Sequence, residues 1–211
     1  MIKIISFDMD GTLVNEDFDD KIWMEELPRK YAETKNIPFE EAKEYVYSEY
    51  EIYKENNNWS SLEFWFNRFG MENWKEIIEK NTNLIEVYPE TVEVIKELKK
   101  KFKIIIITQA PREFIDVKLK DIEHLFDSVY SSTHHFNSLK KDQIIYKKIL
   151  DDMGIGPEEI IHVGDHRNYD YDAPRSIGIK SFLLDRKGKY VDMEIVKDLK
   201  EFMQKIQAKD I

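Results

Sequence analysis

The feature that most restricts the fold of this chain is a run of four isoleucines at residues 104–107. A strand that is apolar at every position is buried on both faces, as the central strands of parallel sheets are. Helical patterns flank the run, over residues 89–101 before it and from Pro111 after it. Because helices that alternate with strands are typical of βαβ units, the sequence predicts an α/β fold with a doubly wound parallel sheet.

Other segments extend this pattern along the chain. Short apolar runs predict further strands at residues 2–7, 128–131, 160–163 and 179–184. Apolar residues with helical spacing predict helices at residues 141–153 and 191–206. From residue 17 to about residue 86 the spacing is helical throughout, and no strand pattern is present. We therefore expect a core domain of residues 1–14 and 87–211, interrupted by an all-helical insert of residues 15–86.

The composition excludes several classes of function. A formal net charge of -10 provides no basic face for nucleic acid or an anionic membrane. The absence of cysteine excludes disulfides, thiol catalysis and thiolate metal sites. No apolar run approaches the length of a membrane span, and the first predicted strand begins too early for a signal peptide. We expect a cytoplasmic protein that is a monomer or a homodimer and binds neither nucleic acid nor a membrane.

Two carboxylates follow the first predicted strand, in the sequence Asp8-Met9-Asp10-Gly11-Thr12. Residues two apart on an extended chain point to the same side, so Asp8 and Asp10 are expected to lie close together. Gly11 lets the chain turn sharply away from them. Because ligands of open parallel sheets bind beyond the carboxyl ends of the strands, these residues predict a functional site.

Polar residues also follow other predicted strands. Thr108 and Gln109 come directly after the isoleucine run, and they offer a hydroxyl and free main-chain N–H groups to a phosphate oxygen. Asp165 follows another strand, with Asp170 five residues further on. Carboxylates that converge without cysteine or histidine indicate a hard cation, and Mg²⁺ takes carboxylates together with waters and phosphate oxygens. A lysine before the helix at residues 141–153 would offset the remaining negative charge.

This order of motifs resembles the haloacid dehalogenase superfamily. The resemblance covers the core from the first strand to Asp170 and beyond, whereas the insert matches only in position and helical character. It implies a Rossmann-like core, with Asp8 as nucleophile and Asp10 as general acid/base. It also implies that Mg²⁺ is held by Asp8, the Asp10 main-chain carbonyl and Asp165, with Asp170 in support. Thr108 corresponds to the serine or threonine of the second motif.

The third motif of the family contains a lysine, and two lysines of this chain compete for that place. The sequence from Lys140 to Tyr146 aligns with the motif if Lys141 replaces the usual proline. We therefore favour Lys140 over Lys141 as the catalytic lysine. Without the other motifs, both would be read as solvated lysines at a helix start.

Four residues are weaker candidates for substrate binding. Gln109 and Arg112 follow the isoleucine strand, and His166 follows Asp165. Trp59 comes after three asparagines in a predicted loop of the insert, although aromatic residues spaced as they are here more often form a core. Both connections of the insert start at the predicted ligand-binding end of the sheet, so we expect the insert to act as a lid or cap.

The sequence therefore predicts a Mg²⁺-dependent phosphatase that hydrolyses a small phosphorylated metabolite through an aspartyl-phosphate. A phosphosugar mutase on the same scaffold is an alternative, as is a binding or regulatory protein that keeps the fold without turnover. The resemblance also admits a 2-haloacid dehalogenase, which Asp10 disfavours because the dehalogenases lack an aspartate at that place. The identity of the substrate is not predicted.

Overall fold

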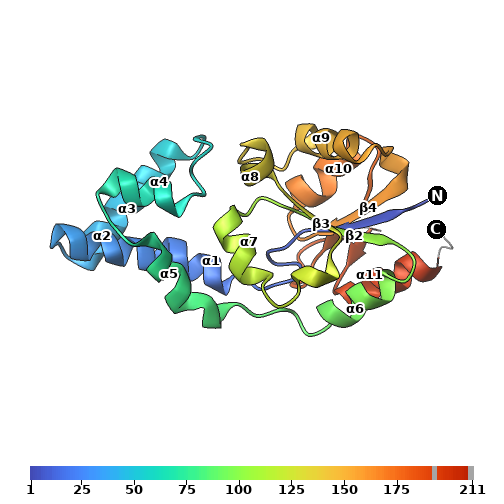
Figure 1. The fold of residues 1–211 in the computed structure, drawn as a ribbon, viewed down its shortest axis with the longest axis horizontal. Helices are drawn as coiled ribbons and strands as arrows, with labels where there is room; N and C mark the ends of the chain where they lie inside the picture. The colour runs from blue at the N-terminus through green and yellow to red at the C-terminus, as the bar shows by residue number, and fades with distance from the viewer. Residues whose placement is uncertain (192–193, 209–211) are drawn as a thin grey trace.

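The computed structural model of the chain describes residues 1–191 and 194–208. Within these residues, one six-stranded parallel sheet has the order β3-β2-β1-β4-β5-β6 (Figure 1). The strands are β1 (Ile4–Phe7), β2 (Lys103–Thr108), β3 (Ser128–Ser131), β4 (Ile160–Gly164), β5 (Lys180–Leu184) and β6 (Ile195–Val196). The chain order reverses on either side of β1, so the predicted doubly wound parallel sheet is confirmed.

Helices pack on both faces of the sheet because alternate residues of the central strands point to opposite sides. Ile104 and Ile106 of β2 belong to the apolar cluster under α6 (Thr91–Leu98) and α11 (Leu199–Ala208). Ile105 and Ile107 belong to the cluster under α9 (Gln143–Met153). All four isoleucines are buried, and the burial of each side chain stabilises the fold by roughly 1.5–3 kcal/mol. The isoleucine run thus joins two helical layers.

The carboxyl-terminal part of the core differs from the prediction. The helix expected over residues 191–206 begins only at Leu199, and Ile195–Val196 forms strand β6 beside β5. The helix begins after Asp198, because the Asp198 side chain accepts a hydrogen bond from the Glu201 amide and caps the helix. Pairing with a sheet edge therefore overrides helical spacing here. Residues 192–193 of the predicted helix lie outside the described residues.

Residues 17–84 are entirely helical or in loops, as predicted, and contain no strand. The helices are α1 (Asp17–Lys21), a π-helical turn (Ile22–Glu26), α2 (Leu27–Lys35), α3 (Phe39–Tyr53), α4 (Leu62–Phe69), α5 (Trp74–Asn81) and a 3₁₀ turn (Thr82–Leu84). Trp65 of α4 is fully buried between Tyr50 and Phe69, at ring-centroid distances of 4.9 and 5.5 Å. The insert therefore has an aromatic core, which is continuous with the apolar cluster on one face of the sheet.

Two short segments connect the insert to the sheet, and they run side by side. Val14 and Val87 form an antiparallel bridge, and the Asn15 amide donates to the Glu86 carbonyl. The Asn15 side chain in turn accepts from the Glu86 amide. The predicted domain boundaries, after residues 14 and 86, fall within this paired segment.

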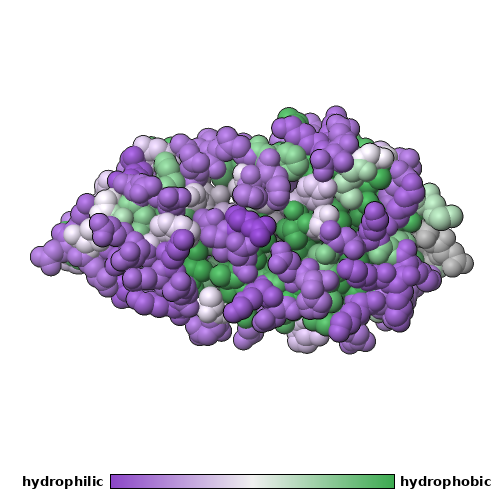
Figure 2. Space-filling view, viewed as in Figure 1, coloured by the Kyte–Doolittle hydropathy of each residue, from purple (hydrophilic) through white to green (hydrophobic). Residues whose placement is uncertain are grey.

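The insert contacts the core through α7 (Arg112–Lys118), which follows β2 (Figure 1). Phe114 of α7 packs against Phe18 at 5.1 Å and Trp23 at 5.7 Å between ring centroids. Farther out, Lys140 of the core pairs with Glu55 of the insert at 2.9 Å. Hydrophilic side chains cover most of the face in Figure 2, and hydrophobic ones are visible mainly near its middle, around α7. None of the helices described here is both long and apolar enough to cross a membrane.

Candidate active site

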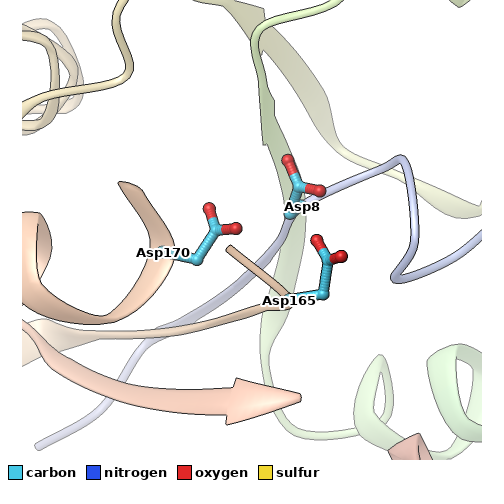
Figure 3. Close-up of side chains that lie close together, drawn as sticks. All are labelled: Asp8, Asp165 and Asp170. Atoms are coloured by element: carbon cyan, nitrogen blue, oxygen red, sulfur yellow. The ribbon is translucent and has the colours of Figure 1, made fainter. Parts of the chain in front are cut away.

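Three carboxylates meet at the carboxyl ends of β1 and β4, and their oxygens lie within 4.8 Å of one another (Figure 3). Asp8 follows β1, Asp165 follows β4, and Asp170 lies in the π-helical turn Arg167–Asp172. The two strands are neighbours, and the Asp8 amide donates to the Val163 carbonyl at 2.9 Å. The structure thus brings together three of the predicted metal residues. An oxygen-only set of this kind fits a hard cation such as Mg²⁺.

Two glycines make room for these carboxylates. A Cβ atom on Gly11 would lie 2.4 Å from the Asp165 Oδ2 atom, and Gly11 also has a φ of +70°. A Cβ atom on Gly164 would lie 2.4 Å from the Asp170 Cγ atom. Any other residue at either position would displace a carboxylate, so both glycines are required by the geometry of the site.

The lysine that reaches the carboxylates is Lys141, and the preference for Lys140 is wrong. The Lys141 ammonium contacts the Asp8 carboxylate, lies 2.5 Å from Asp170 Oδ1 and donates to the Ile107 carbonyl at 3.0 Å. Lys140 points outward and has a 53% exposed side chain. Both lysines lie in the non-helical segment just before Asp142, which caps α9, and there the Lys140 side chain is exposed while that of Lys141 is buried.

Burial and like charge make the carboxylate cluster costly to ionise. Burial raises the pKa of Asp8 well above its usual range; Lys141 acts to lower this pKa, while Asp170 and Asp165 raise it further. Burial also raises the pKa of Asp165 to about 7, with a further contribution from Asp170. Positive charge close to these two carboxylates would favour their ionised forms.

Asp170 is the exception, because a buried hydrogen-bond network holds it in its ionised form. Burial opposes ionisation, but Lys141 and His162 overcome it and lower the pKa of Asp170. His162 lies fully buried on β4, where Nε2 is 3.1 Å from Asp170 Oδ1 and Nδ1 is 2.8 Å from the Ser6 hydroxyl. The Tyr146 hydroxyl lies 2.9 Å from the same Nε2 atom. Sequence reasoning missed this network, since a histidine within an apolar strand gives no signal of its partners.

Asp10 is not among the three clustered carboxylates. Its Oδ1 atom lies 2.5 Å from the Lys118 ammonium, which also contacts Asp19 of α1. Burial, followed by the charge of Asp10, raises the pKa of Asp19 to about 7. The sequence analysis did not identify Lys118 or Asp19. The one signal for Lys118 is a lysine on a helix face otherwise occupied by buried Phe114 and Ile115.

Thr108, the predicted residue of the second motif, is buried at the end of β2. Its hydroxyl oxygen accepts a hydrogen bond from the Ala110 amide at 3.1 Å. The Gln109 side chain donates to the Leu139 carbonyl, which ties β2 to the loop before α9. Gln109 is therefore engaged in holding that loop, and its predicted contact with substrate stays a prediction.

The other candidates for substrate binding have mostly structural partners. Arg112 is exposed and pairs with Asp116 on its own helix at 2.7 Å. Trp59 packs against Trp23 with 5.6 Å between ring centroids, and its indole N–H donates to the Tyr50 carbonyl at 3.1 Å. Trp59 thus belongs to the aromatic core of the insert, as its spacing favoured.

A cavity of about 540 Å³ opens beside Asp165, between the paired linkers and the loop after β5. His166 lines it and stacks on Tyr169, with 4.5 Å between ring centroids. Arg186 lies in its wall, where the guanidinium donates to the Thr12 carbonyl at 2.9 Å and lies 3.7 Å from the centre of the Tyr88 ring. Among the residues that line this cavity, Gly11, Asp165 and His166 were singled out from the sequence.

Comparison with known proteins agrees with this arrangement. A family described as haloacid dehalogenase-like hydrolase matches residues 2–178 of the chain. The GMP/IMP nucleotidase YrfG of Escherichia coli (strain K12) is 26% identical over 183 residues, which cover 85% of this chain and 81% of that protein.

Solved structures resemble the whole fold. A HAD phosphatase from Thermococcus onnurineus superposes with a TM-score of 0.83 at 24% identity and covers 97% of this chain and 98% of its own. A 2-haloacid dehalogenase from Pseudomonas syringae pv. Tomato DC3000 superposes with a TM-score of 0.69 at 19% identity, with complete coverage of both chains. These similarities concern the fold, which phosphatases and dehalogenases share. Because the family match spans most of the chain, the protein belongs to the haloacid dehalogenase-like hydrolases.

Proposed function

We propose that this hydrolase is a Mg²⁺-dependent phosphatase that acts on phosphate monoesters of small metabolites. The observation that carries the proposal is the surroundings of Asp8, whose carboxylate contacts the Lys141 ammonium and lies within 4.8 Å of two further carboxylates. Such a site offers a nucleophile together with places for positive charge. The nucleotidase relative makes GMP and IMP the first esters to test.

The residues for the metal are those that the carboxylate cluster presents. Asp8 and Asp165 would hold Mg²⁺ directly with the Asp10 main-chain carbonyl, and Asp170 would support the site. The bound ion would draw negative charge from the phosphoryl oxygens. This assignment is supported by the raised pKa of Asp8 and of Asp165, since a cation would offset the cost of burying these carboxylates in their ionised form.

Asp8 would act as the nucleophile of the first step. An Asp8 oxygen attacks phosphorus, the bond from phosphorus to the ester oxygen breaks, and an aspartyl-phosphate forms. Both the carboxylate and the phosphoryl group are negatively charged, so their approach requires neutralisation. Lys141 supplies a buried positive charge beside Asp8, and the Thr108 hydroxyl is available to a phosphoryl oxygen.

Asp10 would carry the proton in both steps. It gives a proton to the leaving oxygen in the first step and takes one from the attacking water in the second, when the bond from phosphorus to Asp8 breaks. The different surroundings of the two aspartates support this division. Asp8 faces the carboxylate cluster and Lys141, whereas Asp10 faces Lys118. Two carboxylates in different environments can take different roles in one reaction.

The helical insert, residues 15–86, would act as the cap that covers the reacting groups. Its two linkers pair at Val14 and Val87, next to the motif that carries Asp8 and Asp10. A lid in this position would exclude bulk water from the aspartyl-phosphate and select the leaving group.

The test measures phosphate release from a panel of phosphate monoesters that includes GMP and IMP, with Mg²⁺ and with EDTA. We expect Mg²⁺-dependent release that Asp8→Asn reduces by at least about a thousandfold. Asp116→Asn is the matched control, because Asp116 is exposed on the surface of α7 and pairs with Arg112 of the same helix. Rapid acid quench with labelled ester should trap phosphate on the wild-type protein and none on Asp8→Asn.

Three results would contradict the proposal. Full activity of Asp8→Asn, with contaminating phosphatase excluded, would show that Asp8 is not the nucleophile. Unchanged activity in EDTA would show that hydrolysis does not need the metal. Formation of a phosphorylated isomer, or release of halide from a 2-haloacid, in place of phosphate would assign the site to a mutase or a dehalogenase.

A further inference from the structure

Lys118 lies on the last turn of α7, on the face that packs into the protein. The residue is only 2% exposed, and its ammonium lies 5.5 Å from the centre of the Phe18 ring and 5.4 Å from that of Phe114. Phe18 belongs to the insert and Phe114 to the core. Lys118 therefore occupies the joint between the two parts of the molecule.

A buried ammonium is costly unless carboxylates pair with it. Lys118 has two such partners, Asp10 beside the first motif and Asp19 on α1 of the insert. Aromatic faces on either side add a smaller cation–π attraction. The side chain is thus fixed in place by contacts from three segments that are far apart in the sequence.

We infer that Lys118 is a positioning residue that orients Asp10 for proton transfer to the leaving group. This inference rests on the proposed function, in which Asp10 carries the proton. Lys118 acts only through Asp10.

The geometry of Asp10 explains why it needs a positioning partner. Its side chain is 26% exposed, and the residue lies beyond the end of β1. The sheet therefore does not fix the rotamer of Asp10. Lys118 contacts the Oδ1 atom, which leaves Oδ2 as the oxygen that can carry the transferred proton. A carboxylate held by one oxygen presents the other in a constant direction, as proton transfer requires.

Asp19 extends this arrangement into the insert. The same ammonium holds Asp10 of the core and Asp19 of α1, so the orientation of Asp10 is set at the joint between insert and core. The ammonium and the two aromatic rings also serve the packing of that joint. The experiment must therefore separate an effect on proton transfer from one on packing.

The test compares two esters whose leaving groups differ in their need for a proton. The alkyl ester is the member of the panel that the wild type hydrolyses fastest, and the aryl ester is 4-nitrophenyl phosphate, whose leaving group departs as a stable anion. Lys118→Met should lower the rate constant for formation of the aspartyl-phosphate, measured by rapid acid quench in a single turnover, about 100-fold with the alkyl ester and less than about fivefold with the aryl ester. Asp10→Asn should show the same pattern, and Lys118→Arg should restore at least about a tenth of the lost rate.

Two further variants keep the test decisive. Lys118→Met leaves two buried carboxylates without their cation, so the double variant with Asp19→Asn removes one of them and protects folding. Lys99→Met is the matched control, since Lys99 contacts the Leu125 carbonyl and Asp127 on the core surface; we expect no change for either ester.

The outcomes separate this inference from the proposed function. The positioning role would be overturned if Lys118→Met and its double variant with Asp19→Asn lost the same share of the rate with both esters, or lost none. The wild type would still be a phosphatase in that case. Absence of phosphate release by the wild type, or full activity of Asp8→Asn, would instead overturn the proposed function. A selective loss for the alkyl ester, with recovery in Lys118→Arg, is the expected result.

Discussion

Replacing Asp165 with asparagine should stabilise the metal-free protein and at the same time abolish hydrolysis. Burial and the nearby Asp170 raise the pKa of Asp165 from 3.8 to about 7. At about 1.36 kcal/mol for each pKa unit, keeping this carboxylate ionised above pH 7 costs the folded state about 4 kcal/mol. Asparagine removes the charge but must still be desolvated, and it loses the hydrogen bond that the carboxylate accepts from its own amide. We expect a net gain of about 2 kcal/mol.

The sign of the pH dependence follows from proton binding. Between about pH 4 and pH 7 the folded wild-type protein holds a proton on Asp165 that the unfolded chain has lost. The contribution of Asp165 to stability therefore falls as the pH rises through this window. Asp165→Asn has no such proton, so compared with the wild type it should be about 2 kcal/mol less stable near pH 4, gain stability as the pH rises, and keep a constant advantage of about 2 kcal/mol above pH 7.

The assay is urea unfolding in EDTA, followed by tryptophan fluorescence, at several pH values from about 4 to about 8. Asp116→Asn is again the control, because an exposed ion pair contributes only about 0–1 kcal/mol. Adding Mg²⁺ should raise the midpoint of the wild type and leave that of Asp165→Asn almost unchanged. The reasoning would be refuted if Asp165→Asn were less stable than the wild type above pH 7 in EDTA, or if the difference between them did not depend on pH.

Three further predictions concern other residues. In the phosphate-release assay, Lys141→Met should lower kcat at least about 100-fold, and Lys140→Met should stay within about threefold of the wild type. A larger loss of kcat in Lys140→Met than in Lys141→Met would contradict the structure. His162→Phe should lower the free energy of unfolding by about 1–3 kcal/mol in urea, because Asp170 and Ser6 lose a buried partner; an unchanged midpoint would count against the network. Trp59→Ala should lower the free energy of unfolding by about 2 kcal/mol or more and leave KM within about twofold of the wild type. A large rise in KM with unchanged stability would instead indicate that Trp59 contacts the substrate.

Much of the fold could be predicted from the sequence, because the signals are local. The isoleucine run can only be buried on both faces, and the helical spacing of residues 17–84 is independent of the sheet. Strand β6 could not be predicted in this way, since two residues become a strand only because β5 offers an edge to pair with. Asp198 then determines where α11 begins.

The types of residue at the site could also be predicted, because polar residues directly follow the predicted strands and the carboxyl ends of parallel strands lie at one edge of the sheet. Asp8 and Asp165 had to approach each other once β1 and β4 were neighbours, and the structure places Asp170 with them. By itself, the sequence thus determined a parallel α/β core, a helical insert and the carboxylates that gather at one end of the sheet.

Only the tertiary structure decided which charged groups meet. The sequence favoured Lys140 over Lys141, but the folded segment before the Asp142 cap leaves Lys140 exposed and places Lys141 on Asp8. Lys118 reaches Asp10 only because α7 packs against the first motif. The physical reason is the same in both cases. A buried charge is tolerated only where opposite charges from distant segments converge on it, and that convergence depends on how the elements pack rather than on any local pattern.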